Sequence, residues 1–230
     1  RRYSGLMEAT QRVSPPKVSA DHPGVNELFS LLAYGEVAAF YRLTDEARMA
    51  PDLRGRINMA RMAAAEMGHY DVVRDTLEAR GVDVLAAMAP YAPALERYHR
   101  LTMPSTWLEA LVKTYVGDAM AADLYLAIAG SLPDEVAEVV REVLAETGHS
   151  QFVVAEVHSA VTASSRQRSR LALWSRRLLG EAITQAQFVL ADHDELVDLV
   201  LAGGGLGQLT EFYERLQRTH DDRMRQLGLA

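Results

Sequence analysis

One four-residue motif, Glu-x-Gly-His, occurs twice in the 230-residue chain, and the two copies stand eighty residues apart. The first copy runs from Glu66 to His69 in the segment AAAEMGHY, and the second runs from Glu146 to His149 in LAETGHSQ. Positions i and i+3 share one face of an α-helix, so each copy directs a carboxylate and an imidazole to the same side. A fold that uses both copies must bring two helices together face to face.

An acidic residue that follows a glycine precedes each copy of the motif. Glu36, in YGEVAAF, stands thirty residues before Glu66, and Asp118, in VGDAMAA, stands twenty-eight residues before Glu146. The chain therefore contains a tandem helix-hairpin repeat in which one helix supplies a single acid and the next supplies Glu-x-x-His. A two-metal carboxylate site inside a four-helix bundle uses this set of residues in this order.

The hydrophobic pattern predicts an all-α protein. Apolar residues recur at intervals of three and four along nearly the whole chain, and we find no run of alternating β-branched residues. Pro51 separates the first two helices, and Gly81 is well placed to end the second. Thr106 and Glu109 can form a capping box at the start of the third helix, and Pro133 opens the fourth.

The connections between these helices are short, long and short, which is the connectivity of a ferritin-like four-helix bundle with one long crossover. Two additional C-terminal helices complete a single domain over residues 21–230, after a flexible N-terminal tail over residues 1–20. We place the bundle core at about 23–162, with helices at about 23–49, 52–80, 105–130 and 133–162, a mostly irregular connection at 82–104, and the extra helices at about 165–192 and 206–227.

The composition excludes several kinds of site. The chain has no cysteine, which removes disulfides, thiolate zinc sites and cysteine-ligated iron–sulfur clusters. The formal net charge of −7 disfavours a protein whose whole surface binds nucleic acid. No apolar run reaches the roughly 18 residues that span a bilayer, and no leader peptide opens the sequence. We expect a cytoplasmic protein with no membrane partner, in which carboxylates and histidines hold any metal.

The repeat predicts six metal ligands with an excess of carboxylates, a set that suits iron or manganese. We assign two glutamates as bridging ligands, two acids as terminal ligands and one imidazole to each metal ion. Asp123, on the same helix as Asp118, is the alternative ligand, and Glu181, which follows Gly180, is a candidate seventh carboxylate. The bridging ligands are Glu66 and Glu146, the terminal ligands Glu36 and Asp118, and the imidazoles His69 and His149.

The arrangement Glu36, Glu66-Met-Gly-His69, Asp118, Glu146-Thr-Gly-His149 resembles the ferritin-like diiron carboxylate superfamily. Within that superfamily the chain is similar to the tRNA isopentenyl-adenosine hydroxylase-like family. The resemblance implies a non-haem diiron monooxygenase with two iron ions, manganese being the alternative, and with dioxygen as co-substrate. One oxygen atom would enter a C–H bond of a prenylated tRNA adenosine, and the other would leave as water. Asp118 departs from the glutamate that is usual at its position.

The resemblance also implies partners. No flavin or nicotinamide fingerprint is visible, so two electrons per turnover would come from an external donor, a ferredoxin or a reductase. A tRNA would be the macromolecular substrate, and a homodimer is left open. The segment SSRQRSRLALWSRR, residues 164–177, carries five arginines around Trp174 that could hold phosphates, although a solvated helix face is the preferred explanation of them.

Two other functions fit the same residues. The first is an iron oxidase or peroxide-scavenging protein, which needs the six ligands but no pocket for an organic molecule. The second is a non-catalytic helical binding protein that has kept the pattern and lost the metal. The extra C-terminal helices favour a hydroxylase, because they can wall a substrate cavity.

Overall fold

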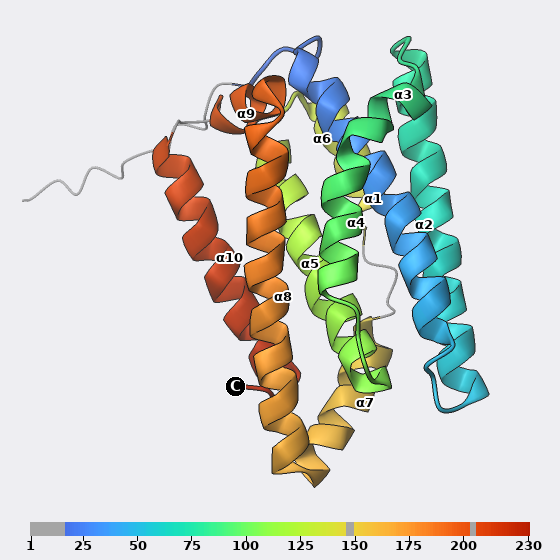
Figure 1. Cartoon of the computed structure of the whole chain (residues 1–230). Coiled ribbons are helices and arrows are strands. Elements are labelled where there is room, and N and C mark those ends of the chain that lie inside the picture. Colours follow the sequence, from blue (N-terminus) through green and yellow to red (C-terminus); the bar gives the residue numbers. More distant parts are fainter. Residues whose placement is uncertain (1–16, 146–149, 203–205) are drawn as a thin grey trace, which may run out of the picture.

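The computed structural model describes residues 17–145, 150–202 and 206–230, and these residues form helices and connections without any β-strand. This confirms the predicted all-α class. Figure 1 shows α1 and α2 lying side by side at one edge of the bundle, with α8 and α10 at the opposite edge. The elements are α1 (Pro23–Ala47), α2 (Leu53–Ala79), α3 (Val84–Met88), the 3₁₀ helix η1 (Ala89–Tyr91), α4 (Ala92–Leu101), α5 (Trp107–Ala129), α6 (Asp134–Val143), α7 (Ser150–Ala163), α8 (Ser165–Ala191), α9 (Asp194–Leu201) and α10 (Leu206–Gln226).

Side-chain caps fix where the long helices begin. The Asp52 carboxylate accepts a hydrogen bond from the Gly55 amide at 2.8 Å at the start of α2, and the Thr106 hydroxyl accepts one from the Glu109 amide at 3.3 Å at the start of α5. These bonds satisfy amide donors that have no partner within the helix. Gly81 ends α2 with a φ of +74°, the left-handed conformation that glycine adopts without strain.

Three features of the helices differ from the predictions. The connection at 82–104 contains α3, η1 and α4, because two of its three prolines, Pro90 and Pro93, stand in the first turns of η1 and α4, where a missing amide proton breaks no hydrogen bond. The predicted fourth helix is not continuous: α6 ends at Val143, and α7 begins at Ser150. The short helix α9, which starts at Asp194, lies between the two predicted C-terminal helices, where no element is predicted, because eight residues carry too little periodicity to identify.

The N-terminal tail predicted over residues 1–20 lies mostly outside the described residues. Its last residues are held against the body of the protein. The Val18 amide donates to the Ser131 carbonyl at 2.9 Å, and the Lys17 ammonium lies 2.5 Å from the Asp134 carboxylate. In the part of the chain that the structure describes, no helix combines the length and the apolar character that crossing a membrane requires.

Two hydrophobic cores fill the bundle, one toward each end. On α1 the first core uses residues from Val25 to Ala33 and the second uses Leu43. On α2 the order is reversed, with Val73 in the first core and Met59 in the second, as expected for two antiparallel helices. The segments between the cores carry the acidic and basic residues described below. The polar site therefore lies at mid-height, enclosed by apolar packing above and below.

Candidate metal centre

Three of the six predicted ligands come together between α1 and α2. Their candidate ligand atoms, one each from Glu36, Glu66 and His69, all lie within 4.8 Å of one another. His69 Nδ1 is 3.4 Å from Glu36 Oε2 and 3.5 Å from Glu66 Oε2. The Glu36 side chain is only 8% exposed. Two carboxylates and one imidazole converging in a sheltered position form a donor set that fits iron or manganese.

The surroundings set the charges of this cluster. Burial raises the pKa of Glu36 to about 8, because apolar surroundings disfavour the carboxylate form. Hydrogen bonds with Glu36 and Glu66 raise the pKa of His69 to about 10. Burial opposes ionisation of Glu66, but hydrogen bonds with His69 and Glu36 outweigh it and lower the pKa of Glu66. Without metal, Glu36 and His69 therefore retain protons at higher pH than they would in an unfolded chain, and the protons that they hold must leave when a cation binds.

Asp118, the fourth predicted ligand, does not join this group. Its Oδ1 atom accepts a hydrogen bond from Arg42 Nη2 at 2.7 Å. Arg42 Nη1 donates to Glu46 at 3.1 Å and to Thr114 at 3.0 Å, and Lys113 Nζ lies 3.5 Å from Glu46. Burial raises the pKa of Asp118 although the charge of Arg42 acts in the opposite direction. Asp118 therefore belongs to an ion network beside the cluster in which Arg42, Glu46 and Lys113 are buried and Asp118 is partly exposed to the cavity.

The other two predicted ligands, Glu146 and His149, lie outside the described residues, so their role stays a prediction. The alternative ligand Asp123 is bound elsewhere, since its carboxylate accepts two hydrogen bonds from Arg223, at 2.6 and 2.9 Å. The candidate seventh carboxylate, Glu181, is not among the described residues that gather at the cluster or line the cavity beside it.

A cavity of about 1540 Å³ adjoins the cluster. Glu36, Glu66, His69 and Asp118 all contribute to its wall, and 42% of the Asp118 side chain is exposed. The remaining lining is largely apolar and comes from helices at both edges of the bundle, including α8 and α9. Among these apolar residues are Leu31, Leu95, Val143, Val189 and Leu196.

The hydroxyl groups of two tyrosines lie close to the glycines that precede Glu36 and Asp118. The sequence analysis did not single out these tyrosines. A Cβ atom built on Gly117, before Asp118, would lie 3.3 Å from the Tyr98 hydroxyl. One built on Gly35, before Glu36, would lie 3.7 Å from the Tyr125 hydroxyl. Gly117 thus lets the Tyr98 phenol approach the backbone next to a predicted ligand, whereas the distance at Gly35 is that of an ordinary van der Waals contact.

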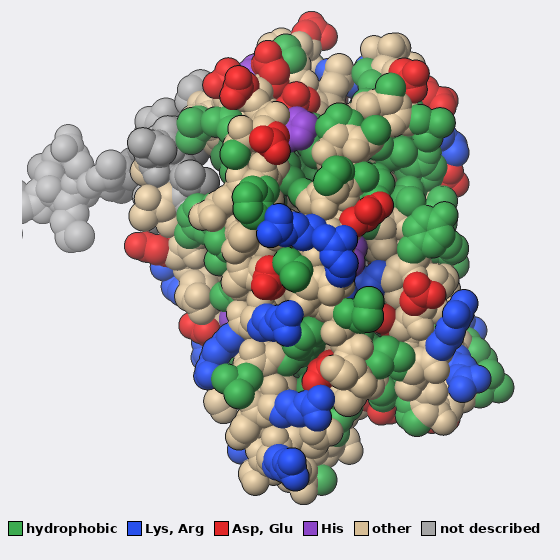
Figure 2. Space-filling view, viewed as in Figure 1, with side chains coloured by type: hydrophobic (Ala, Val, Ile, Leu, Met, Phe, Trp, Pro, Cys, Tyr) green, Lys and Arg blue, Asp and Glu red, His purple; other side chains and the backbone are tan. Residues whose placement is uncertain are grey.

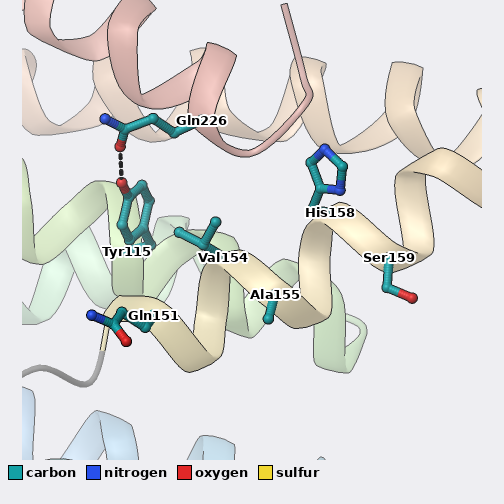
Figure 3. A pocket seen from close by; sticks show the side chains of 7 residues that line it. All are labelled: Tyr115, Gln151, Val154, Ala155, His158, Ser159 and Gln226. Carbon is teal, nitrogen blue, oxygen red and sulfur yellow. Dashed lines mark hydrogen bonds between the residues drawn. The ribbon is translucent and has the colours of Figure 1, made fainter.

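Three other tyrosines, Tyr34, Tyr41 and Tyr115, stand near predicted ligands in the sequence, and the contacts found for them are with other residues. Tyr34 donates to Glu96 at 2.9 Å, and Tyr41 is 65% exposed. Tyr115 donates to Gln226 in a second pocket, of about 500 Å³, between α5, α7 and α10 (Figure 3). None of the described residues that line this pocket is acidic, so it offers no comparable donor set.

The buried ion network was also absent from the sequence-based prediction. A signal for it existed, because Gly35, Ala39, Arg42 and Glu46 follow the helical spacing of a single face. On that face an arginine and a glutamate replace the apolar residues of a core stripe. Such a replacement indicates either a buried ion pair or a polar site.

The arginine-rich segment of α8 is exposed, and Figure 2 shows basic side chains along this helix. Arg170 binds the Glu109 carboxylate at 2.9 Å, and Arg177 donates to the Leu101 carbonyl. Trp174 is buried and donates its indole N–H to the Glu109 carbonyl at 2.9 Å, so it joins α8 to α5 and does not face a ligand. Part of the basic stripe therefore has a structural role.

Comparison with known proteins supports the fold and the superfamily. A search of curated proteins found no match to this chain. A family model described as ferritin-like domain, actinomycetes, matches residues 20–203. The match covers α1 to α9, including both helices that supply the cluster. The chain therefore belongs to this family of ferritin-like domains from actinomycetes.

Proposed function

We propose that the chain is a metal-dependent, oxygen-activating oxidoreductase that hydroxylates an organic substrate. The observation that carries this proposal is the convergence of Glu36, Glu66 and His69 on the wall of a large cavity. A ferritin-like iron oxidase needs the ligands but no such cavity. The apolar lining from α8 and α9 favours an organic molecule.

The bound metal would supply activation of dioxygen, and the residues of the chain would prepare the place where this occurs. Glu66 is the ionised ligand, and Glu36 and His69 become ligands when their protons leave. The apolar wall excludes water from the position of the substrate. In the overall reaction one C–H bond becomes C–OH, the second oxygen atom leaves as water, and two electrons and two protons are consumed.

The finer parts of the proposal follow the family resemblance. A second ion would use Asp118, Glu146 and His149, and Glu66 and Glu146 would bridge the two ions. An external ferredoxin or reductase would supply the electrons. A prenylated tRNA adenosine would be the substrate, with Arg166, Arg168 and other exposed arginines of α8 contacting phosphates. A deletion strain that keeps an unchanged profile of hydroxylated prenyl-adenosine would exclude this substrate.

Metal analysis tests the proposal first. We expect protein produced with iron supplementation to retain iron after desalting, and we expect Glu66→Ala or His69→Ala to lose most of it, because each removes a converging ligand. Glu78→Ala is the matched control, since Glu78 is an exposed acid on the same helix. Elemental analysis measures the metal content of each variant. Wild-type protein without metal, or Glu66→Ala with wild-type content, would contradict the proposed centre.

Substrate oxidation is tested separately. The reduced, iron-loaded protein is mixed with dioxygen and prenylated tRNA, and the digested nucleosides are analysed by mass spectrometry. We expect a product heavier by one oxygen atom, labelled when ¹⁸O₂ is used. Rapid oxidation of iron without any labelled organic product, over a range of apolar substrates, would favour the iron-oxidase alternative.

A further inference from the structure

The buried network beside the cluster holds Asp118 in an ion pair, and this has a consequence for metal loading. We propose that the Arg42 guanidinium competes with a metal ion for the Asp118 carboxylate. The chain then binds one ion tightly, and a second ion binds only when it breaks the Arg42–Asp118 ion pair. This inference rests on the proposed function, because it assumes that Glu36, Glu66 and His69 bind metal. It concerns how the centre is filled.

The position of Arg42 supports this role. Its guanidinium lies 2.7 Å from Asp118 Oδ1, and its charge also acts on Glu66, whose pKa it helps to lower. Arg42 thus binds the one described ligand that remains apart from the cluster, and it lines the same cavity as the clustered ligands. A divalent cation bound at Asp118 would meet a guanidinium that stays charged at any pH of interest, and like charges at such short range repel strongly.

Arg42 also has no easy way to move aside. It is buried, and its second terminal nitrogen is held by Glu46 and Thr114. A buried guanidinium that loses one of its carboxylates keeps its desolvation penalty and loses the attraction that offsets it. Breaking the Arg42–Asp118 ion pair therefore costs free energy. This cost weakens the binding of any ion that requires Asp118.

The charge balance of the network points the same way. Arg42 and Lys113 carry positive charge, Glu46 and Asp118 carry negative charge, and all four side chains lie in one set of contacts. The network is neutral without metal. A divalent ion added at Asp118 would bring positive charge that the four side chains of this network do not balance, whereas the cluster of two glutamates and one histidine has carboxylates of its own to balance an ion.

The test is a titration of metal-free full-length protein with Mn²⁺, counting free ions by electron paramagnetic resonance and heats by calorimetry. For wild-type protein we expect one tight ion per chain and a second step weaker by about tenfold to a hundredfold, the range that follows from the strength of a charge-assisted hydrogen bond. Arg42→Gln should strengthen the second step by a similar factor. Arg42→Lys, which keeps a positive charge, should leave it weak.

Two further variants keep the test decisive if Arg42→Gln folds poorly. Asp118→Asn should leave the first step unchanged and abolish the second. Arg223→Gln is the matched control, because it breaks another arginine–aspartate pair to α5, at Asp123, outside the cluster. It should alter neither step. A strengthened second step in Arg223→Gln would instead identify Asp123 as the ligand and overturn the assignment.

The outcomes separate the two proposals. Two equally tight ions in wild-type protein, or a first step weakened by Asp118→Asn, would overturn the inference about Arg42 and leave the metal centre standing. Absence of any tight Mn²⁺ or Fe²⁺ binding to wild-type protein would overturn the proposed function, and the inference about Arg42 would fall with it.

Discussion

Two helical glycines, Gly24 in α1 and Gly68 in α2, have very different surroundings in this protein. A Cβ atom on Gly24, in the first turn of α1, would lie 2.3 Å from the Glu195 carbonyl oxygen and 2.8 Å from the Leu199 Cβ atom. A Cβ atom on Gly68, between Glu66 and His69, would meet nothing within 4 Å. Gly24 is thus required for α9 to dock on α1, whereas Gly68 leaves open space beside the cluster of Glu36, Glu66 and His69.

Alanine substitutions at these two glycines should have opposite effects on the metal-free protein. Gly24→Ala should destabilise the fold by about 1–3 kcal/mol or more, because backbone atoms of α9 must shift. Gly68→Ala should stabilise it by about 0.5–1 kcal/mol, because alanine restricts the unfolded chain and strengthens the helix. Urea denaturation measures both. A loss of stability in Gly68→Ala would show that an unrecognised neighbour approaches this position.

Among the elements, α5 and α8 are joined through one residue at the start of α5. The Glu109 carboxylate accepts a hydrogen bond from the Ser105 amide at 2.7 Å and binds Arg170 Nη2 at 2.9 Å. The Thr106 hydroxyl completes the cap by accepting from the Glu109 amide. Glu109 therefore both starts α5 and fastens α8 to it, which positions the wall of the cavity.

Variants of this cap should rank by the number of bonds that they remove. Thr106→Ala should cost about 0.5–2 kcal/mol, the usual range for a lost helix cap. Glu109→Ala should cost more, because it removes a cap and a contact between helices, although the exposed Arg170 limits the ion-pair contribution. Unfolding monitored by circular dichroism gives both values. Equal stability of Glu109→Ala and an Arg166→Ala control would contradict this role.

The sequence predicted the long helices well because their limits depend on local signals. Periodicity, proline positions and caps placed α1, α2, α5 and α8 within a few residues of their observed ends. The repeated Glu-x-Gly-His motif and its upstream acids predicted a group of six ligands, and the described structure gathers three of them, Glu36, Glu66 and His69. Local signals could not give the partner of Asp118, because Arg42 comes from another helix and the two residues meet only through tertiary packing. Short helices such as α9 were not predicted, because they carry too little periodicity.

At the scale of the whole molecule, the cluster predicts how stability depends on pH. The pKa of Glu36 rises from 4.5 in an unfolded chain to about 8, and that of His69 rises from 6.5 to about 10. Across this range the folded chain binds more protons than the unfolded chain, so the free energy of unfolding falls as pH rises. The contribution of His69 is complete below its unfolded value and is lost as pH passes about 10.

Metal-free protein should therefore show a melting temperature that falls steadily between about pH 5 and about pH 9. Bound metal should reverse this fall in melting temperature. Metal binding releases protons from Glu36 and His69, so the affinity for metal increases with pH and stabilises the folded protein more. Differential scanning calorimetry with and without a chelator compares the two states. Glu36→Gln should flatten the metal-free profile. A metal-free melting temperature that rises with pH would contradict the protonated cluster.

The clustered ligands all belong to one hairpin, α1 and α2, within residues 23–79. Closing a loop inside a single hairpin costs little chain entropy, and contacts of short sequence separation form quickly. Chains fold from the N-terminus during synthesis. The hairpin that carries Glu36, Glu66 and His69 can thus assemble as soon as α2 has left the ribosome, before α5 brings Asp118 to Arg42. A newly made chain would capture its first ion early, and that ion would guide the docking of the helices that follow.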